Sequence, residues 1–421
     1  MFDVLKSSWA LLLGMGLLMV GNGLQGSLLG VVGTENNFST FSLSIIMSGY
    51  FLGFLGGSRM APDMIRRVGH VRVFAALASF ISAVLILYPT MTNPVAWTIG
   101  RVIIGFCFSG VYVTAESWLN NASSNENRGK SLSLYLIVQM IGIVSAQGIL
   151  NLADTNGYTL FVISSVLVSI SFAPILLSIS PTPAFETAKA MSVKELFQRS
   201  PLGCVSVAVL GAIFAAQFGM GAVYATQAGM SVGELSIFVS TLYIGAMVLQ
   251  YPIGWISDRM DRRQLIGIVS ALGLIGTFIG FFAGGQFELL LVAAFIIGGM
   301  SNPLYGLAIA HTNDFLDPED MAAASGGLVF ANGLGAIAGP VVTGWTMQVF
   351  GPEGFYVYIG VLMAFLAGYA MYRMTQRPTV SVEDSGTWAP VLQSATPVAV
   401  EVAQEVFIEA QEEAAEEEAN A

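Results

Sequence analysis

Acidic and basic side chains alternate in one short run, residues 254–263, which reads Gly-Trp-Ile-Ser-Asp-Arg-Met-Asp-Arg-Arg between two long apolar stretches. Asp258 stands one and four residues before Arg259 and Arg262, so it can accept hydrogen bonds from either guanidinium. The pattern indicates an ion pair that forms and breaks, called a tie below. We predict no catalytic residue and no enzymatic activity. The alternative is that these two arginines and Arg263 only fix the orientation of the flanking stretches.

A weaker copy of this run occurs 192 residues earlier, where Arg67 takes the place of Arg259. Arg66 precedes it, but the acidic residue is displaced to Asp63 and extra residues intervene. The first half of the chain therefore needs another acid if it is to form a comparable tie.

Glu116 and Arg128 are the candidates, on either side of a polar turn. Glu116 lies only about one helical turn, ~6 Å, from Asn120, so we expect it to join Arg128 and the arginines at 66–67 in one gate. The alternative is that Glu116, the most plausible carboxylate within an apolar stretch, carries a proton.

Arg101 is placed differently, about six residues inside the apolar stretch 95–120. An unpaired charge at that depth is costly, so its guanidinium should face a cavity, backbone carbonyls or a bound anion. Snorkelling to the lipid headgroups is the alternative. Glu116 cannot neutralise it, because fifteen residues of helix put the two ~22 Å apart.

Amides and phenols are scarce in the apolar stretches and need polar partners there, which a wet cavity would supply. Hydrogen bonding between helices is the alternative for each. Together with Arg101, the side chains that we expect to line a substrate site are Asn22, Gln25, Tyr112, Gln139, Gln217, Tyr305 and Asn332.

The composition places these residues in a lipid bilayer. Hydrophobic residues make up 55% of the 421 residues and charged residues 10%, and the mean hydropathy is +0.72. This is too little charge to cover a soluble globule. The basic residues form no stripe, so nucleic-acid binding is not expected. Cys107 and Cys204 lie apart in apolar stretches, and we predict no metal site, disulfide or cofactor.

A helix needs about 20 apolar residues to cross the hydrocarbon core. Applied along the chain, this length criterion predicts an all-α polytopic protein with twelve transmembrane helices. Their expected windows are 9–33, 41–60, 72–89, 95–120, 130–152, 157–179, 202–227, 234–257, 265–284, 288–312, 321–349 and 355–374.

The cations predict the orientation of these spans. Alternate turns and both ends carry them, whereas the turns at 34–40 and 153–157 contain no Lys or Arg. By the positive-inside rule both termini are cytoplasmic, which requires an even number of spans.

Several residues, most of them polar, recur between the halves of the chain. Gly105, Tyr112 and Asn120 match Gly298, Tyr305 and Asn313 at an offset of 193, and the pairs Gln25–Gln217 and Gln139–Asn332 follow at 192 and 193. We therefore expect two pseudo-symmetric six-helix bundles, 1–180 and 201–378, joined by a cytoplasmic linker at 181–200. Duplicated bundles of this kind place a binding site at their interface.

Residues 254–263 resemble the loop signature of the major facilitator superfamily, Gly-x-x-x-Asp-Arg-x-(Gly/Asp)-Arg-(Arg/Lys). Arg101, Gly105 and Gly110 more loosely resemble its fourth-span signature, and the stretch 112–129 with 66–74 looks most like the YcaD-like bacterial subgroup. The resemblance covers about residues 5–378. It implies a secondary transporter of a bacterial inner membrane that moves a small molecule by rocker-switch alternating access, and that is monomeric.

The tail at 379–421 holds ten of the 27 acidic residues and no Lys or Arg. This composition predicts a solvated, mostly disordered cytoplasmic segment. Val402, Val406 and Ala410, at four-residue spacing, also permit a short helix that docks on a partner.

Three functions remain open from the sequence. The first is a proton-coupled antiporter that exports a small organic molecule, and the second is a symporter or facilitator for uptake. The third is a non-transporting receptor or scaffold, which the lack of a sizeable soluble domain disfavours. No deep carboxylate lies in the first span, so the direction and the coupling ion stay undecided.

Overall fold

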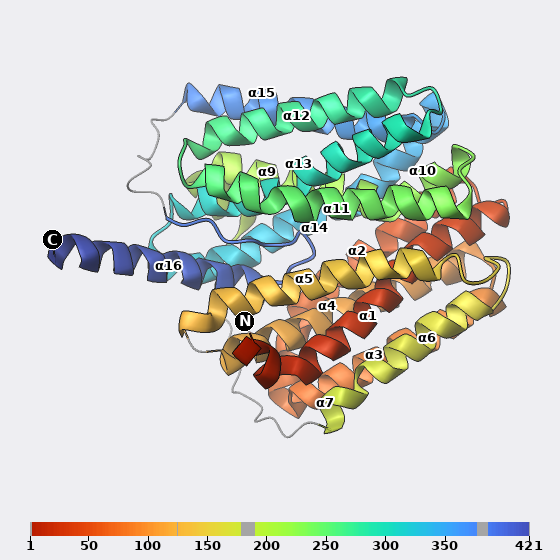
Figure 1. The fold of residues 1–421 in the computed structure, drawn as a ribbon, viewed down its shortest axis with the longest axis horizontal. Coiled ribbons are helices and arrows are strands. Elements are labelled where there is room, and N and C mark those ends of the chain that lie inside the picture. Colours follow the sequence, from red (N-terminus) through yellow and green to blue (C-terminus); the bar gives the residue numbers. More distant parts are fainter. Residues whose placement is uncertain (1, 124, 178–189, 377–385, 421) are drawn as a thin grey trace.

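The computed structural model of the chain describes residues 2–123, 125–177, 190–376 and 386–420 (Figure 1). Within them the protein is all-α, and twelve helical segments are long and apolar enough to cross a membrane. Each coincides with one of the twelve expected windows to within a few residues, except that the second span runs eight residues further. The prediction of twelve spans is confirmed.

The first six spans form one half of the molecule. They are α1 (Phe2–Glu35), α2 (Thr40–Val68), α3 (His70–Leu87) with the 3₁₀ turn η1 (Tyr88–Thr90), α4 (Pro94–Ala122), α5 (Asn125–Ile149), and α6 (Thr159–Ser171) with α7 (Ala173–Leu177).

The short helix α8 (Val193–Arg199) leads into the second half. Its spans are α9 (Pro201–Ala215) with the π-helical turn η2 (Ala216–Met220) and α10 (Gly221–Gln227), α11 (Val232–Ser257), α12 (Arg262–Phe282), α13 (Phe287–Asn313), α14 (Pro318–Phe350) and α15 (Gly354–Met374).

The turn between the second and third spans differs from the expectation. Residues 57–68 remain helical, and the chain reverses at Gly69 alone, which adopts a φ of 85°. Glycine adopts this conformation without steric cost. Asp63 and Arg66 therefore lie within α2 and pair across one helical turn, and the residues that seemed to lengthen the loop lengthen the helix instead.

The two halves pack alike, as the duplication requires. A Cβ on Gly105 of α4 would overlap the carbonyl of Tyr50 on α2, and one on Gly298 of α13 would overlap the carbonyl of Leu242 on α11. These contacts match at offsets of 193 and 192. The close approach of the second and fourth helices is thus built twice, and the two pseudo-symmetric six-helix bundles are confirmed.

The two bundles lie one above the other in Figure 1, with α1–α7 below and α9–α15 above. At the end that carries residues 36–40 and 228–231, called the far end here, they are hydrogen-bonded together. Ser48 Oγ donates to the Ile337 carbonyl at 2.6 Å, and Asn151 Nδ2 donates to Ser236 Oγ at 2.9 Å. The opposite end, called the charged end, carries the turns at 66–69 and 258–261.

The tail differs from the disordered segment that its acidity predicts. Residues 386–396 enter between the bundles at the charged end, and α16 (Pro397–Asn420) projects from that end (Figure 1). The reason lies in its uneven composition: Val391, Leu392, Val400 and Phe407 are all less than 10% exposed. The tail buries its apolar half, and its acidity is concentrated beyond that half.

Candidate functional site

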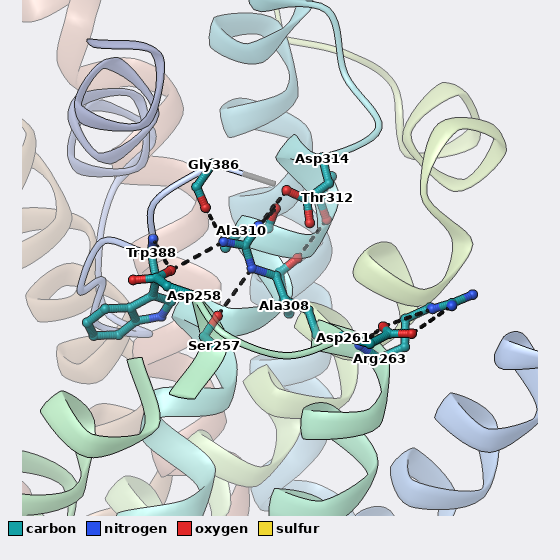
Figure 2. A network of polar contacts seen from close by, with 11 residues as sticks. Ser257, Asp258, Asp261, Arg263, Ala308, Ala310, Thr312, Asp314, Gly386 and Trp388 are labelled. Atoms are coloured by element: carbon teal, nitrogen blue, oxygen red, sulfur yellow. Dashed lines mark hydrogen bonds and ion pairs between the residues drawn. The ribbon is translucent and has the colours of Figure 1, made fainter. Parts of the chain in front are cut away.

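The charged run at 254–263 forms a network at the end of α11. Arg262 of α12 is 3% exposed and donates to Ser257 Oγ at 3.2 Å, to Asp258 Oδ1 at 3.5 Å and to Asp314. Arg262 also donates to the carbonyl of Gly386 in the tail. Figure 2 shows Asp258, Asp314 and Gly386 converging from three segments.

Asp258 completes the link to the tail by accepting a hydrogen bond from the Trp388 backbone N–H at 2.8 Å. The expected tie between Asp258 and Arg262 therefore exists, but its elements belong to the second bundle. In this conformation the network connects that bundle to the tail instead of to the first bundle.

Of the other arginines of the expected gate, Arg259, Arg66 and Arg67 are exposed, whereas Arg263 is buried like Arg262. Arg259 stacks over the Trp255 ring at 4.1 Å, and Arg263 pairs with Asp261 at 2.7 Å. Arg66 pairs with Asp63, and Arg67 is exposed.

Glu116 and Arg128 each bind the tail. The buried Glu116 carboxylate accepts from Tyr135 Oη at 3.2 Å and from the hydroxyl of Thr396. Arg128 of α5 pairs with Glu405 at 2.8 Å and with Glu409 at 3.2 Å. Both residues thus hold the tail against the first bundle.

A cavity of about 40 Å³ lies between the bundles. Three predicted residues line it: Asn22, Tyr112 and Asn332. The tail forms one wall through residues 392–395. The remaining walls come from both bundles and include six aromatic side chains, which are Tyr50, Phe51, Phe54, Phe214, Phe218 and Tyr243.

A buried polar chain extends from this cavity into the first bundle. Asn22 Nδ2 donates to Tyr112 Oη at 3.1 Å, Gln25 Nε2 donates to Asn22 Oδ1 at 3.1 Å, and Arg101 donates to Gln25 Oε1 at 2.8 Å. The Arg101 guanidinium lies 4.7 Å from the centre of the Tyr50 ring and is fully buried. The snorkelling alternative is therefore excluded for Arg101.

The other predicted residues are buried away from the walls just described. Gln217 Nε2 donates to Ser301 Oγ at 2.9 Å, so in this conformation Gln217 forms the hydrogen bond between helices that was the alternative to a substrate contact. Gln139 is 3% exposed, and the hydroxyl of the fully buried Tyr305 has no hydrogen-bond partner among the described residues.

Sequence reasoning missed Tyr50, Asn302 and Gln393. Asn302 lines the cavity from α13, and Gln393 lines it from the tail. The run of Tyr50, Phe51 and Phe54 was a usable signal for an aromatic wall. Nothing in the sequence of residues 392–395 indicated that they enter the cavity.

Two six-helix bundles with a cavity at their interface are an architecture that many membrane transporters share. The Major Facilitator Superfamily model matches residues 11–231 and 202–408. The chain belongs to this superfamily, and it is a multi-pass membrane protein and a secondary transporter.

Named relatives are bacterial. The uncharacterized MFS-type transporter YfkF of Bacillus subtilis is 25% identical over 354 residues, covering 81% of this chain and 89% of YfkF. The uncharacterized MFS-type transporter YcaD of Escherichia coli O7:K1 is 23% identical over 328 residues, covering 77% of this chain and 85% of YcaD. The predicted resemblance to the YcaD-like subgroup is confirmed.

Solved structures share the fold. A variant of the nucleoside transporter NupG superposes with a TM-score of 0.70 at 16% identity, covering 86% of this chain and 99% of NupG. A D-xylose-proton symporter gives 0.62 at 17% identity, covering 86% and 96%.

Proposed function

We propose that this transporter moves a small, uncharged, amphipathic organic solute by rocker-switch alternating access. The observation that carries the proposal is the lining of the central cavity, where aromatic rings stand beside the amides of Asn22, Asn302 and Asn332. None of the described residues that line it carries a formal charge. A charged solute would lose its hydration there without gaining a counter-charge, whereas rings and a few hydrogen-bonding groups would be accommodated.

The charged end is proposed to face the cytoplasm of a bacterial inner membrane, so that both termini are cytoplasmic. The support is the distribution of cations, which gather in the turns and helix ends of that side. The far-end contacts between the bundles then close the outer side. The same distribution supports a cytoplasmic position for the expected linker at 181–200, of which 181–189 lie outside the described residues.

Proton-coupled export is proposed as the direction and the coupling. Glu116 is the candidate proton carrier, because this buried carboxylate lies within the span of α4 and its hydrogen-bond donors include the neutral hydroxyls of Tyr135 and Thr396. A carboxyl group in such surroundings can bind or release a proton as the bundles move.

The test is counterflow in proteoliposomes, with and without a pH gradient. It uses a panel of radiolabelled uncharged aromatic solutes beside their carboxylated and aminated analogues. The full chain and a chain that ends at residue 378 are both assayed. We expect the uncharged members to exchange, an inside-acid gradient to alter their accumulation, and Asn332→Ala to slow exchange.

Asn156→Ala, at an exposed amide, is the matched control and should leave exchange unchanged. Preferential exchange of the charged analogues would overturn the substrate class. Exchange that ignores the pH gradient would favour a facilitator, and a lack of exchange by both chains would favour the receptor or scaffold.

A further inference from the structure

The tail first engages the second bundle, through the same charged run that was expected to form a gate. As described above, the Gly386 carbonyl accepts a hydrogen bond from Arg262, and the Trp388 N–H donates one to Asp258. The Trp388 indole packs directly against Gly254, where a Cβ atom would overlap the ring. The indole Nε1 also lies 3.0 Å from the position that a Cβ on Gly306 would take. The first described residues of the tail, from Gly386 to Trp388, therefore sit in a fitted slot between α11 and α13.

The next residues enter the substrate cavity. Leu392, Gln393, Ser394 and Ala395 line it, and Gln393 Nε2 donates to the Ser301 carbonyl at 3.0 Å. The space left is about 40 Å³, roughly room for one or two water molecules. Sites for small organic ligands typically offer about 300–1,000 Å³. A substrate and the tail cannot occupy this cavity together.

The tail then crosses to the first bundle. Thr396 donates to Glu116, and Glu405 and Glu409 pair with Arg128. Gln404 Nε2 donates back to Asn313 Oδ1 of the second bundle at 2.9 Å. One continuous segment is thus hydrogen-bonded to both bundles at the charged end, while the far end is already closed by direct contact between them.

Closing the charged end requires the two bundles to approach, and residues 386–407 lie between them, beside a second cavity of about 610 Å³ that Pro397, Val398 and Glu401 help to line. We propose that this segment is an autoinhibitory plug, which competes with substrate for the cavity and holds the bundles open at the charged end until it leaves. The competition with substrate rests on the proposed transport function, whereas the occlusion of the cavity can be measured without it.

A tethered plug needs only modest intrinsic affinity. A short tether keeps a segment at an effective concentration in the millimolar range, so an intrinsic Kd near 0.1 mM would leave about one molecule in ten open. With a Kd of that order, removing the plug should raise access to the cavity roughly tenfold.

The test compares three chains in vesicles, each carrying Asn302→Cys in a background with Cys107→Ser and Cys204→Ser. They are the full chain, a chain that ends at residue 378, and a control that ends at residue 410 and keeps the docked segment. Labelling of the cavity thiol by a membrane-impermeant thiol reagent is the first readout. Solute counterflow, measured without the Asn302→Cys change, is the second.

We expect labelling and exchange to rise roughly tenfold in the chain that ends at 378 and to stay at the full-chain rate in the control. A synthetic peptide of residues 386–407, added to the shorter chain, should restore slow labelling. Trp388→Ser in the full chain should also accelerate labelling. This variant replaces the truncated chain in the test if truncation lowers the unfolding temperature.

Equal labelling of all three chains would overturn the plug. So would a folded shorter chain that loses exchange, because the tail would then be part of the working transporter. Faster labelling with no exchange by any chain would support the plug and count against the proposed function, so the two failures can be told apart.

Discussion

The guanidinium of Arg101 is a charge buried inside α4, and its described partners are neutral. They are the Gln25 carbonyl oxygen at 2.8 Å, the sulfur of Met47 at 3.5 Å and the face of the Tyr50 ring, while its Nε has no hydrogen-bond partner among the described residues. The planar guanidinium can make these contacts simultaneously, and a lysine ammonium cannot. Arg101 therefore orients Gln25 and, through it, the cavity amide of Asn22.

Arg101→Lys should lower thermal stability and slow transport. The loss expected is about 1–3 kcal/mol, because the change leaves buried acceptors unsatisfied. Unfolding in detergent and counterflow measure the two effects. Arg72→Lys, at an exposed arginine of α3, is the matched control. A variant that keeps wild-type unfolding and exchange would contradict this role.

The pKa of Glu401 makes docking of the tail depend on pH. Burial and the neighbouring Glu405 raise this pKa from the usual 4.5 to about 7. Glu401 lines the second cavity, at the charged end, which is separate from the central cavity and is also lined by Arg59, Asp63 and Arg66 of α2. Because Glu401 holds its proton more tightly in the docked tail than in a released tail, its contribution to docking is fully present below pH 4.5 and is lost as the pH rises through about 7.

Labelling of the Asn302→Cys thiol should therefore accelerate as the cytoplasmic side goes from pH 5.5 to 7.5, once normalised to the chain that ends at 378. We expect at least about a fivefold change, since one pKa unit corresponds to tenfold in affinity and partial exposure reduces it. Glu401→Gln should flatten the profile. An unchanged profile in this variant would assign the titration to another group.

At the scale of helices, close pairs are set by glycines that repeat at the duplication offset. Gly142 of α5 faces the Gly16 carbonyl of α1, and Gly335 of α14 faces the Ala208 carbonyl of α9, again at offsets of 193 and 192. Small residues allow such close approach between membrane helices. The same spacing that revealed the repeat in the sequence therefore also sets the packing within each bundle.

Gly105→Ala and Gly298→Ala should each destabilise the protein by roughly 1–3 kcal/mol, because the added methyl forces two backbones apart. Thermal unfolding measures the loss. Gly368→Ala is the control, since no atom lies within 4 Å of its Cβ position. Equal unfolding temperatures for all three variants would mean that α2–α4 and α11–α13 tolerate separation.

At the scale of the whole molecule, the far end is closed and the charged end is occupied by the tail. If the tail holds this state, removing it should release the far end part of the time. Spin labels at Asn36→Cys and Ala228→Cys, exposed positions of the two bundles, report the opening. The full chain should give a single short distance, and the chain that ends at 378 should add a longer one.

Labels at Asn36→Cys and Thr92→Cys lie within the first bundle and should keep one distance in both chains. A far-end distance that does not respond to truncation would show that direct contacts such as Ser48 with Ile337 close that end without help from the tail.

Much of this architecture was readable from local composition. The apolar windows located twelve spans because each helix must satisfy its backbone within the bilayer, and the repeat predicted two bundles. Site prediction was partial: Asn22, Tyr112 and Asn332 line the cavity, whereas Gln217 bonds to Ser301. A polar residue in a span needs a partner, and its position in the sequence does not say whether that partner is another helix or a ligand.

The sequence by itself determined the spans, their duplication and the charged run at 254–263, because hydropathy, glycine spacing and short-range charge pairs are local properties. Only the tertiary structure decided what that run holds and where the tail lies. Asp258 and Trp388 are 130 residues apart, as Glu116 and Thr396 are 280 apart. The acidic end of the tail dominates its composition, while the buried apolar half finds its place only when both bundles are present to receive it.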